Sequence, residues 1–155
     1  MLEQKEKEDN MIYAVIDTNV FLSGMITNNK ESPTVKVLEA VMQKVIIVSY
    51  HSEIIEEYND VFHRVKFSLN EPVIQNLLNV ITTFGQEIFP KPTGEIFIDK
   101  DDLIFYEVAM EKRDEDAYLV TGNQKHYPIR DFIVTPTEMM KILQKEKNEN
   151  SFLES

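Results

Sequence analysis

Short apolar runs separated by amphipathic stretches dominate the chain and predict an alternation of strands and helices. Buried strands are expected at residues 12–16 (IYAVI), 45–49 (VIIVS) and 117–121 (AYLVT), because each is a brief, nearly continuous apolar run rich in β-formers. Shorter apolar segments at 95–98 and 132–134 are further strand candidates. This alternation favours a central, mainly parallel sheet of four to five strands flanked by helices, a three-layer α/β/α fold.

Helix boundaries are marked by capping residues between these runs. Ser32-Pro33 places a cap before a proline at the first helical position, and Thr135 to Glu138 forms a capping box around Pro136. Asp99 is the expected cap of a helix that runs to about Lys112. The other predicted helices cover residues 20–26, 33–43, 52–62 (with Ser49 or Ser52 as cap) and a stretch that begins at 70–72, and one closes the chain after residue 136.

Composition indicates one domain with charged ends. Residues 1–10 (MLEQKEKEDN) are charged and lack a hydrophobic pattern, so we expect a disordered leader, a single domain over 11–147 and a frayed tail over 148–155. The formal net charge is −11, which disfavours nucleic-acid binding by net attraction and requires local basic patches or bound cations. The absence of cysteine excludes thiolate chemistry, and the lack of a membrane-length apolar run or signal peptide predicts a cytoplasmic protein with no membrane partner.

Polar side chains follow several of the predicted elements. Asp17 comes directly after the first strand, and Thr121-Gly122-Asn123 follows the strand at 117–121. Glu57 is the acid nearest the buried face of its helix, whereas helical angles do not separate Asp101 from Asp102. Each of these residues also has an ordinary structural explanation. Asp17 could cap a helix, and Glu57 could form a surface ion pair. Asp101 and Asp102 could be part of an acidic helix start, and Gly122-Asn123 could be a plain turn.

A bound cation would offset the repulsion between these carboxylates. Carboxylates that converge at one edge of a sheet repel unless a positive group lies among them. Oxygen ligands without sulfur favour Mg²⁺ or Mn²⁺, and these ions suit phosphodiester chemistry because they activate water and offset phosphate charge.

The ordered set of motifs resembles the PIN domain family, and in particular its members that act as toxins of bacterial and archaeal toxin–antitoxin pairs. The matching segments cover nearly all of residues 11–143 in the family's order. They are VIDTNVFLSG (15–24), VSYHSEIIEEYNDV (48–61), DKDDLIFYEVAM (99–110), YLVTGNQKHYP (118–128) and IVTPTEMM (133–140).

This resemblance implies a metal-dependent endoribonuclease that hydrolyses RNA phosphodiester bonds. It implies that Asp17, Glu57 and Asp102 hold Mg²⁺ or Mn²⁺, with Asn19 and Thr121 as polar support. Asn123 matches a catalytic position that is often a fourth aspartate, so this chain departs from the pattern by one charge and a second metal is less expected.

Basic side chains near these motifs are candidates for RNA contact. The expected RNA-binding residues are Lys125, His126 and Arg130, and the expected substrate is single-stranded RNA. A toxin of this kind would have a cognate antitoxin, and the family resemblance is compatible with a homodimer. The competing readings are a non-catalytic PIN-like module that binds a partner protein or RNA, and a metal-dependent phosphatase or flap-type DNA nuclease.

Overall fold

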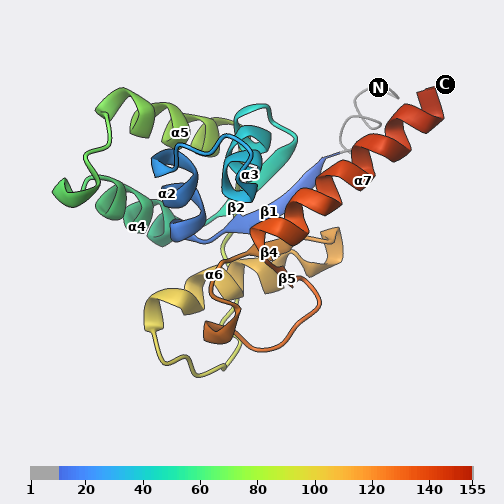
Figure 1. Ribbon diagram of the computed structural model, residues 1–155. Helices are drawn as coiled ribbons and strands as arrows, with labels where there is room; N and C mark the ends of the chain where they lie inside the picture. Colours follow the sequence, from blue (N-terminus) through green and yellow to red (C-terminus); the bar gives the residue numbers. More distant parts are fainter. Residues whose placement is uncertain (1–10, 155) are drawn as a thin grey trace.

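Five parallel strands form the centre of the protein. The structure, a computed structural model, describes the backbone of residues 11–154 and the side chains of residues 11–149, so the leader predicted for residues 1–10 lies outside it. The strand order is β3-β2-β1-β4-β5, and every neighbouring pair is parallel (Figure 1). The strands are β1 (Ile12–Ile16), β2 (Ile46–Tyr50), β3 (Gln86–Glu87), β4 (Tyr118–Val120) and β5 (Ile133–Val134).

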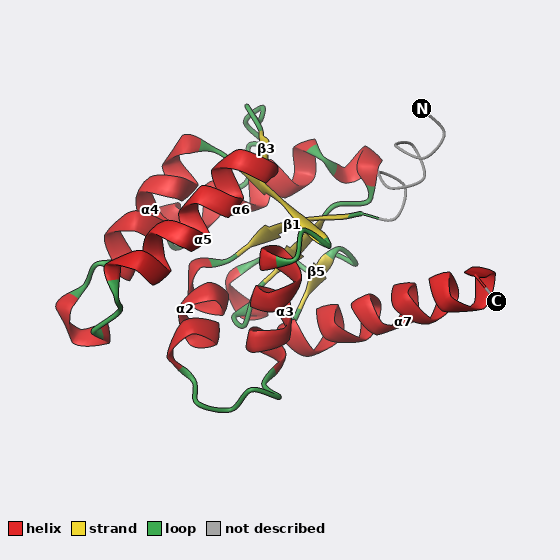
Figure 2. Cartoon of the chain, turned by 90° about the horizontal axis from the view of Figure 1, so that it is seen from above, coloured by secondary structure: helices red, strands yellow, loops and turns green. Residues whose placement is uncertain are grey.

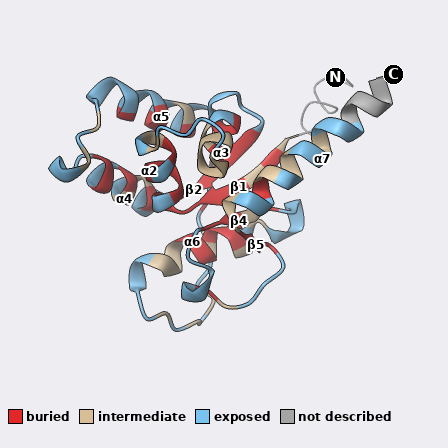
Figure 3. Ribbon diagram, viewed as in Figure 1, coloured by how far each residue is buried: buried red, intermediate tan, exposed pale blue. Residues whose placement is uncertain are grey.

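The first strand occupies the middle of this sheet. Ala14 pairs with Val48 of β2 on one side and with Tyr118 of β4 on the other. Ala14, Val15 and Ile16 are completely buried, which explains their continuous apolar pattern (Figure 3). Because Ile16 pairs with Val120 of β4, the residues that follow these two strands emerge side by side at the carboxyl edge.

Helices cover the sheet and confirm the three-layer α/β/α architecture. Helix α6 packs against β1, β2 and β4, while α3 and α7 pack together on the other side of the sheet in Figure 1. The helices are α2 (Thr18–Ile26), α3 (Pro33–Met42), α4 (Ser52–Phe62), α5 (Glu71–Phe84), α6 (Lys100–Glu111) and α7 (Pro136–Glu154).

A buried tyrosine joins the helices to the end of the central strand. The Tyr58 hydroxyl on α4 donates a hydrogen bond to the backbone carbonyl of Ile16. Its ring contacts Phe21 of α2 edge-on at 5.3 Å between centroids, and it stacks on Phe62 at 5.6 Å. The Phe105 ring of α6 lies 6.2 Å away. Three helices therefore meet in one aromatic cluster directly behind the carboxyl end of β1.

The segment 95–98, one of the candidate strands, is not a strand. Ile96 and Ile98 are almost fully exposed, and only Phe97 turns inward, where its ring packs against Tyr106 and Tyr127. The edge strand is instead β3, which pairs with Ser49 and Tyr50 of β2. Its two polar residues carry no apolar pattern, so periodicity could not find it.

Two of the predicted helix caps make their expected hydrogen bonds, Ser32 occupies its N-cap position without one, and the fourth cap is a different residue. Thr135 and Glu138 exchange reciprocal hydrogen bonds of 3.1 Å, so the predicted capping box is present. The Asp99 side chain accepts from the Asp101 N–H at 2.9 Å, as expected of a cap. Helix α4, however, is capped by His51, whose Nδ1 accepts from the Glu53 N–H, rather than by Ser49 or Ser52.

The last helix continues beyond the expected domain boundary. The backbone of α7 is helical to Glu154, past residue 148, where a frayed tail was predicted. Figure 2 shows this helix projecting from the rest of the fold. Within the described chain, no helix is both long enough and apolar enough to cross a membrane.

Replacing Tyr58 with phenylalanine should destabilise the fold by about 1–2 kcal/mol, because the buried Ile16 carbonyl loses its side-chain donor while the packing stays the same. Denaturant unfolding measures the change. Tyr13→Phe is the matched control, since Tyr13 is half-buried and its hydroxyl makes no hydrogen bond to the described chain. Equal stabilities for the two variants would contradict the role given to the Tyr58 hydroxyl.

Candidate functional site

Asp17 lies at the carboxyl edge of the sheet between two neighbouring strands. Its backbone N–H donates to the Val120 carbonyl at 2.9 Å, which fixes the turn out of β1 against the end of β4. The next residue of the β4 segment, Thr121, donates its hydroxyl to Asp17 Oδ2 at 2.7 Å. The predicted support of Asp17 by Thr121 is thus geometrically present, across 104 positions of sequence.

The Asp17 carboxyl is buried and costly to ionise. Its residue is only 7% exposed, and burial raises its pKa, an effect that the Thr121 hydroxyl and the Thr18 N–H oppose. Asp17 occupies the N-cap position of α2, but its side chain accepts no capping hydrogen bond. Helix capping therefore does not account for a carboxyl group at this position.

Glu57 projects from α4 toward the same edge. Its carboxylate accepts a hydrogen bond from the Thr18 hydroxyl, and Thr18 directly follows Asp17 in the chain. Burial is the largest cause of a raised Glu57 pKa; the Thr18 hydrogen bond opposes it, and the negative charges of Asp17, Asp101 and Asp102 add to it. No ion pair to Glu57 is present among the described residues, so the surface-pair alternative finds no support there.

Asp102, on the first turn of α6, is the third carboxyl group. Burial, followed by the charges of Asp17 and Asp99, raises its pKa to about 6. His126 Nδ1 lies 3.3 Å from Asp102 Oδ2 and favours the ionised form. This contact is close enough for an ion pair but is not aligned as a hydrogen bond, so the buried Oδ2 atom has no hydrogen-bond partner within the described chain.

These carboxyl groups share one electrostatic environment without forming a closed ligand shell. Asp17 raises the pKa of both Glu57 and Asp102, and Asp102 raises that of Glu57. Yet among residues 11–149 no three acidic or histidine side chains are grouped as metal ligands would be. Metal binding by Asp17, Glu57 and Asp102 therefore stays a prediction, and it requires side-chain adjustment.

The remaining predicted residues lie around this group. Asn123 follows Thr121 and donates its backbone N–H to the Thr121 hydroxyl at 3.0 Å, while its own side chain is exposed. Asn19 is exposed, and its side chain makes no hydrogen bond within the described chain. Lys125 is exposed beside His126, whereas Arg130 pairs with Glu95 at 3.5 Å. Their catalytic, supporting and RNA-binding roles are still predictions.

No local sequence pattern places two further side chains at this site, although the sequence makes Tyr127 a candidate for stacking on RNA bases. Thr18 holds Glu57, a partner 39 positions away that no local pattern indicates. The Tyr127 hydroxyl is buried and makes no well-aligned hydrogen bond within the described chain, and the negative charges of Asp17, Asp102 and Glu57 add to burial in raising its pKa. The only available signal was the position of each residue: Thr18 follows Asp17, and Tyr127 follows His126.

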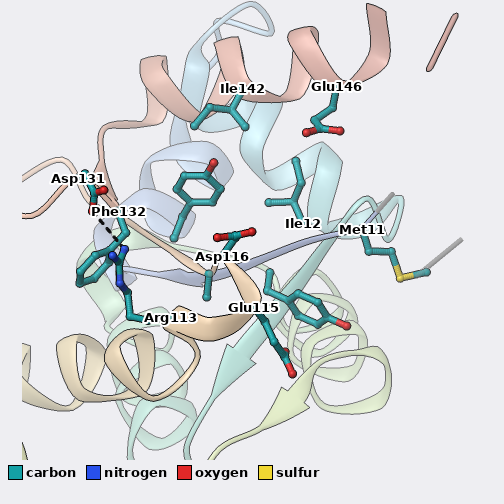
Figure 4. A pocket seen from close by; sticks show the side chains of 12 residues that line it. Met11, Ile12, Arg113, Glu115, Asp116, Asp131, Phe132, Ile142 and Glu146 are labelled. Carbon is teal, nitrogen blue, oxygen red and sulfur yellow. Dashed lines mark hydrogen bonds and ion pairs between the residues drawn. The ribbon is translucent and has the colours of Figure 1, made fainter. Parts of the chain in front are cut away.

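A cavity of about 530 Å³ lies away from the acidic group, at the amino ends of β1 and β4 (Figure 4). It is lined by Ile12 and Tyr118, where β1 and β4 begin, and by Ile142 of α7. Arg113 at its rim pairs with Asp131 at 3.2 Å. None of the predicted site residues lines this cavity, so its size is no guide to the position of the acidic group.

Replacing Asp102 with asparagine should stabilise the metal-free protein at pH 7.5 by roughly 1 kcal/mol, once solvent screening of this partly exposed group is allowed for. The folded pKa is raised from 3.8 to about 6, so the unfolded chain releases its proton first and wild-type stability falls as the pH rises through this window. The gain should shrink toward pH 4. Melting in EDTA across pH 4–7.5 tests this, with exposed Asp114→Asn as control; a gain independent of pH would count against it.

Comparisons with known proteins agree with this architecture. A family model described as PIN domain matches residues 13–125, which include Asp17, Glu57, Asp102 and Asn123. Searches of curated proteins and of solved structures found no match. The family is of the nuclease type. With most of its length matched and a five-stranded parallel sheet between helices, the chain belongs to the PIN domain family.

Proposed function

We propose that this protein is a Mg²⁺- or Mn²⁺-dependent endoribonuclease that hydrolyses RNA phosphodiester bonds, and that it is the toxin of a toxin–antitoxin pair. The observation that carries the proposal is the position of Asp17 at the carboxyl edge of the sheet, where its negative charge raises the pKa of both Glu57 and Asp102. Open α/β sheets bind their ligands at this edge, where side chains from separate strands and helices converge.

The donor set fits a hard divalent cation. All three carboxyl groups have raised pKa values, so the fold disfavours their ionised forms, and a bound cation would stabilise those forms. Among the described residues, the buried Oδ2 of Asp102 and the buried hydroxyl of Tyr127 also make no well-aligned hydrogen bond, as expected where a hydrated ion would bind. Oxygen ligands of this kind are the ones that Mg²⁺ and Mn²⁺ prefer.

Residues of the chain itself would orient the carboxylates that hold the cation. When bound, a divalent cation supplies an activated water and offsets the charge of the scissile phosphate. The Thr121 hydroxyl donates to Asp17 and the Thr18 hydroxyl donates to Glu57, so these two hydrogen bonds would orient the carboxylates toward an ion. Asn123 contributes an amide instead of a carboxylate, so this arrangement favours one tightly held cation over a pair.

RNA would approach a surface that is acidic overall. The net charge of −11 repels phosphates, so binding depends on the cation and on the local basic side chains. Lys125 and His126 lie on the short turn beside Asp102. There they can contact the phosphate backbone of an RNA strand that is bound for cleavage. Arg130 would have to leave Glu95 to join them.

A non-catalytic module that binds a protein or RNA is the second candidate. Two observations favour it: asparagine at position 123, and the lack of a three-residue ligand group within residues 11–149. An antitoxin that covers the acidic group, or a second copy of the chain, would be compatible with either function.

The Asp17→Asn variant should reduce Mn²⁺-dependent cleavage of single-stranded RNA by about 100-fold or more, because losing a charged ligand costs more than the roughly 10- to 100-fold lost with an outer partner. Asp60→Asn is the matched control, since Asp60 is exposed and pairs only with Arg64 at 3.7 Å. RNA, DNA and a phosphomonoester are compared with the same preparations.

Three results separate the candidates. Cleavage of RNA that depends on Asp17 supports the ribonuclease. Cleavage unchanged by the substitution would remove Asp17 from the chemistry, and binding without any turnover would favour the non-catalytic module. Preference for DNA or the phosphomonoester would change the substrate class.

A further inference from the structure

Thr18 links Asp17, which precedes it at the end of β1, to Glu57 on α4. It is the first residue of α2, it follows Asp17 directly, and it is only 4% exposed. Its hydroxyl donates to Glu57 on α4. A buried hydroxyl without a partner would cost about 1–3 kcal/mol relative to an apolar residue, so its pairing with Glu57 has an energetic reason.

Glu57 depends on this contact for its orientation. Thr18 is its hydrogen-bond partner in the described chain, and no lysine, arginine or histidine there forms an ion pair with it. A glutamate side chain has three rotatable bonds, and fixing them costs up to about 2 kcal/mol of conformational entropy. Without the Thr18 donor, Glu57 would sample several rotamers rather than one.

The same arrangement occurs at Asp17. Thr121 donates to Oδ2 of Asp17, just as Thr18 donates to Oε2 of Glu57. Each threonine therefore donates to one oxygen of its carboxylate. The two donors come from different elements of the fold, since Thr18 begins α2 and Thr121 directly follows β4.

We propose that Thr18 is a positioning residue that presents Glu57 to the same divalent cation as Asp17. This inference rests on the proposed metal-dependent function. It assigns to Thr18 an action through Glu57 rather than direct contact with the cation. The alternative is a structural role alone, in which the hydroxyl only satisfies a buried polar position at the start of α2.

Binding of Mn²⁺ to the substrate-free protein distinguishes these roles. In Thr18→Val the branched shape is kept and the hydroxyl is lost, so Mn²⁺ affinity measured by calorimetry should fall about 10-fold or more. Thr18→Ser restores the donor and should recover most of the affinity. Thr82→Val is the matched control, because the Thr82 hydroxyl bonds only to helix carbonyls of α5, at 2.9 Å to Leu78 and 3.5 Å to Asn79.

A double-mutant cycle tests whether Thr18 acts through Glu57. In a Glu57→Gln background, the Thr18→Val substitution should cause little further loss of Mn²⁺ affinity. If Thr18→Val prevents folding, Thr18→Ala removes the donor without placing a methyl group against the carboxylate and replaces it in the cycle. Equal losses in both backgrounds would overturn the positioning role.

Failure of this inference differs from failure of the proposed function. If Asp17→Asn abolishes Mn²⁺ binding while Thr18→Val lowers only the melting temperature, the metal site stands and Thr18 is structural. If Asp17→Asn binds Mn²⁺ as the wild type does, the metal site itself is wrongly assigned.

Discussion

The hydrogen bond from the Tyr58 hydroxyl to the Ile16 carbonyl is the contact on which the acidic site depends. It joins α4 to the end of the central strand one residue before Asp17 and one residue after Glu57. The surrounding rings of Phe21, Phe62 and Phe105 exclude water from this junction. The apolar cluster therefore holds the Asp17 and Glu57 carboxyl groups near each other, although their negative charges repel.

This constraint implies a trade between stability and function. Burial raises the pKa of Asp17, Glu57 and Asp102, and their mutual repulsion adds to the shifts of the last two. A protein selected only for stability would replace one of them by an amide. Asparagine does occupy position 123, so the chain has a neutral group at one of the four positions and retains carboxylates at the other three.

Much of this organisation could be predicted from local pattern. The three main strands, the helix starts at Asp99 and Thr135, and the position of Asp17 at a strand end all follow from short-range chemistry. The hydrophobic pattern gave the wrong result, or none, where contacts between distant parts of the chain determine the structure. β3 exists because Tyr50 and its neighbour offer a free edge, the segment at 95–98 lacks such a partner, and Thr18 binds a glutamate that only the fold brings near.

The strand order also governs when the site can form. Asp17 is synthesised 104 positions before its hydrogen-bond partner Thr121, and β1 cannot be enclosed until β4 has emerged. Contacts of such long sequence separation form slowly, because loop closure comes before the gain in packing. A chain on the ribosome that has not yet reached Thr121 therefore carries the first acid of the site without its final support, and the complete constellation can form only after β4 has been made.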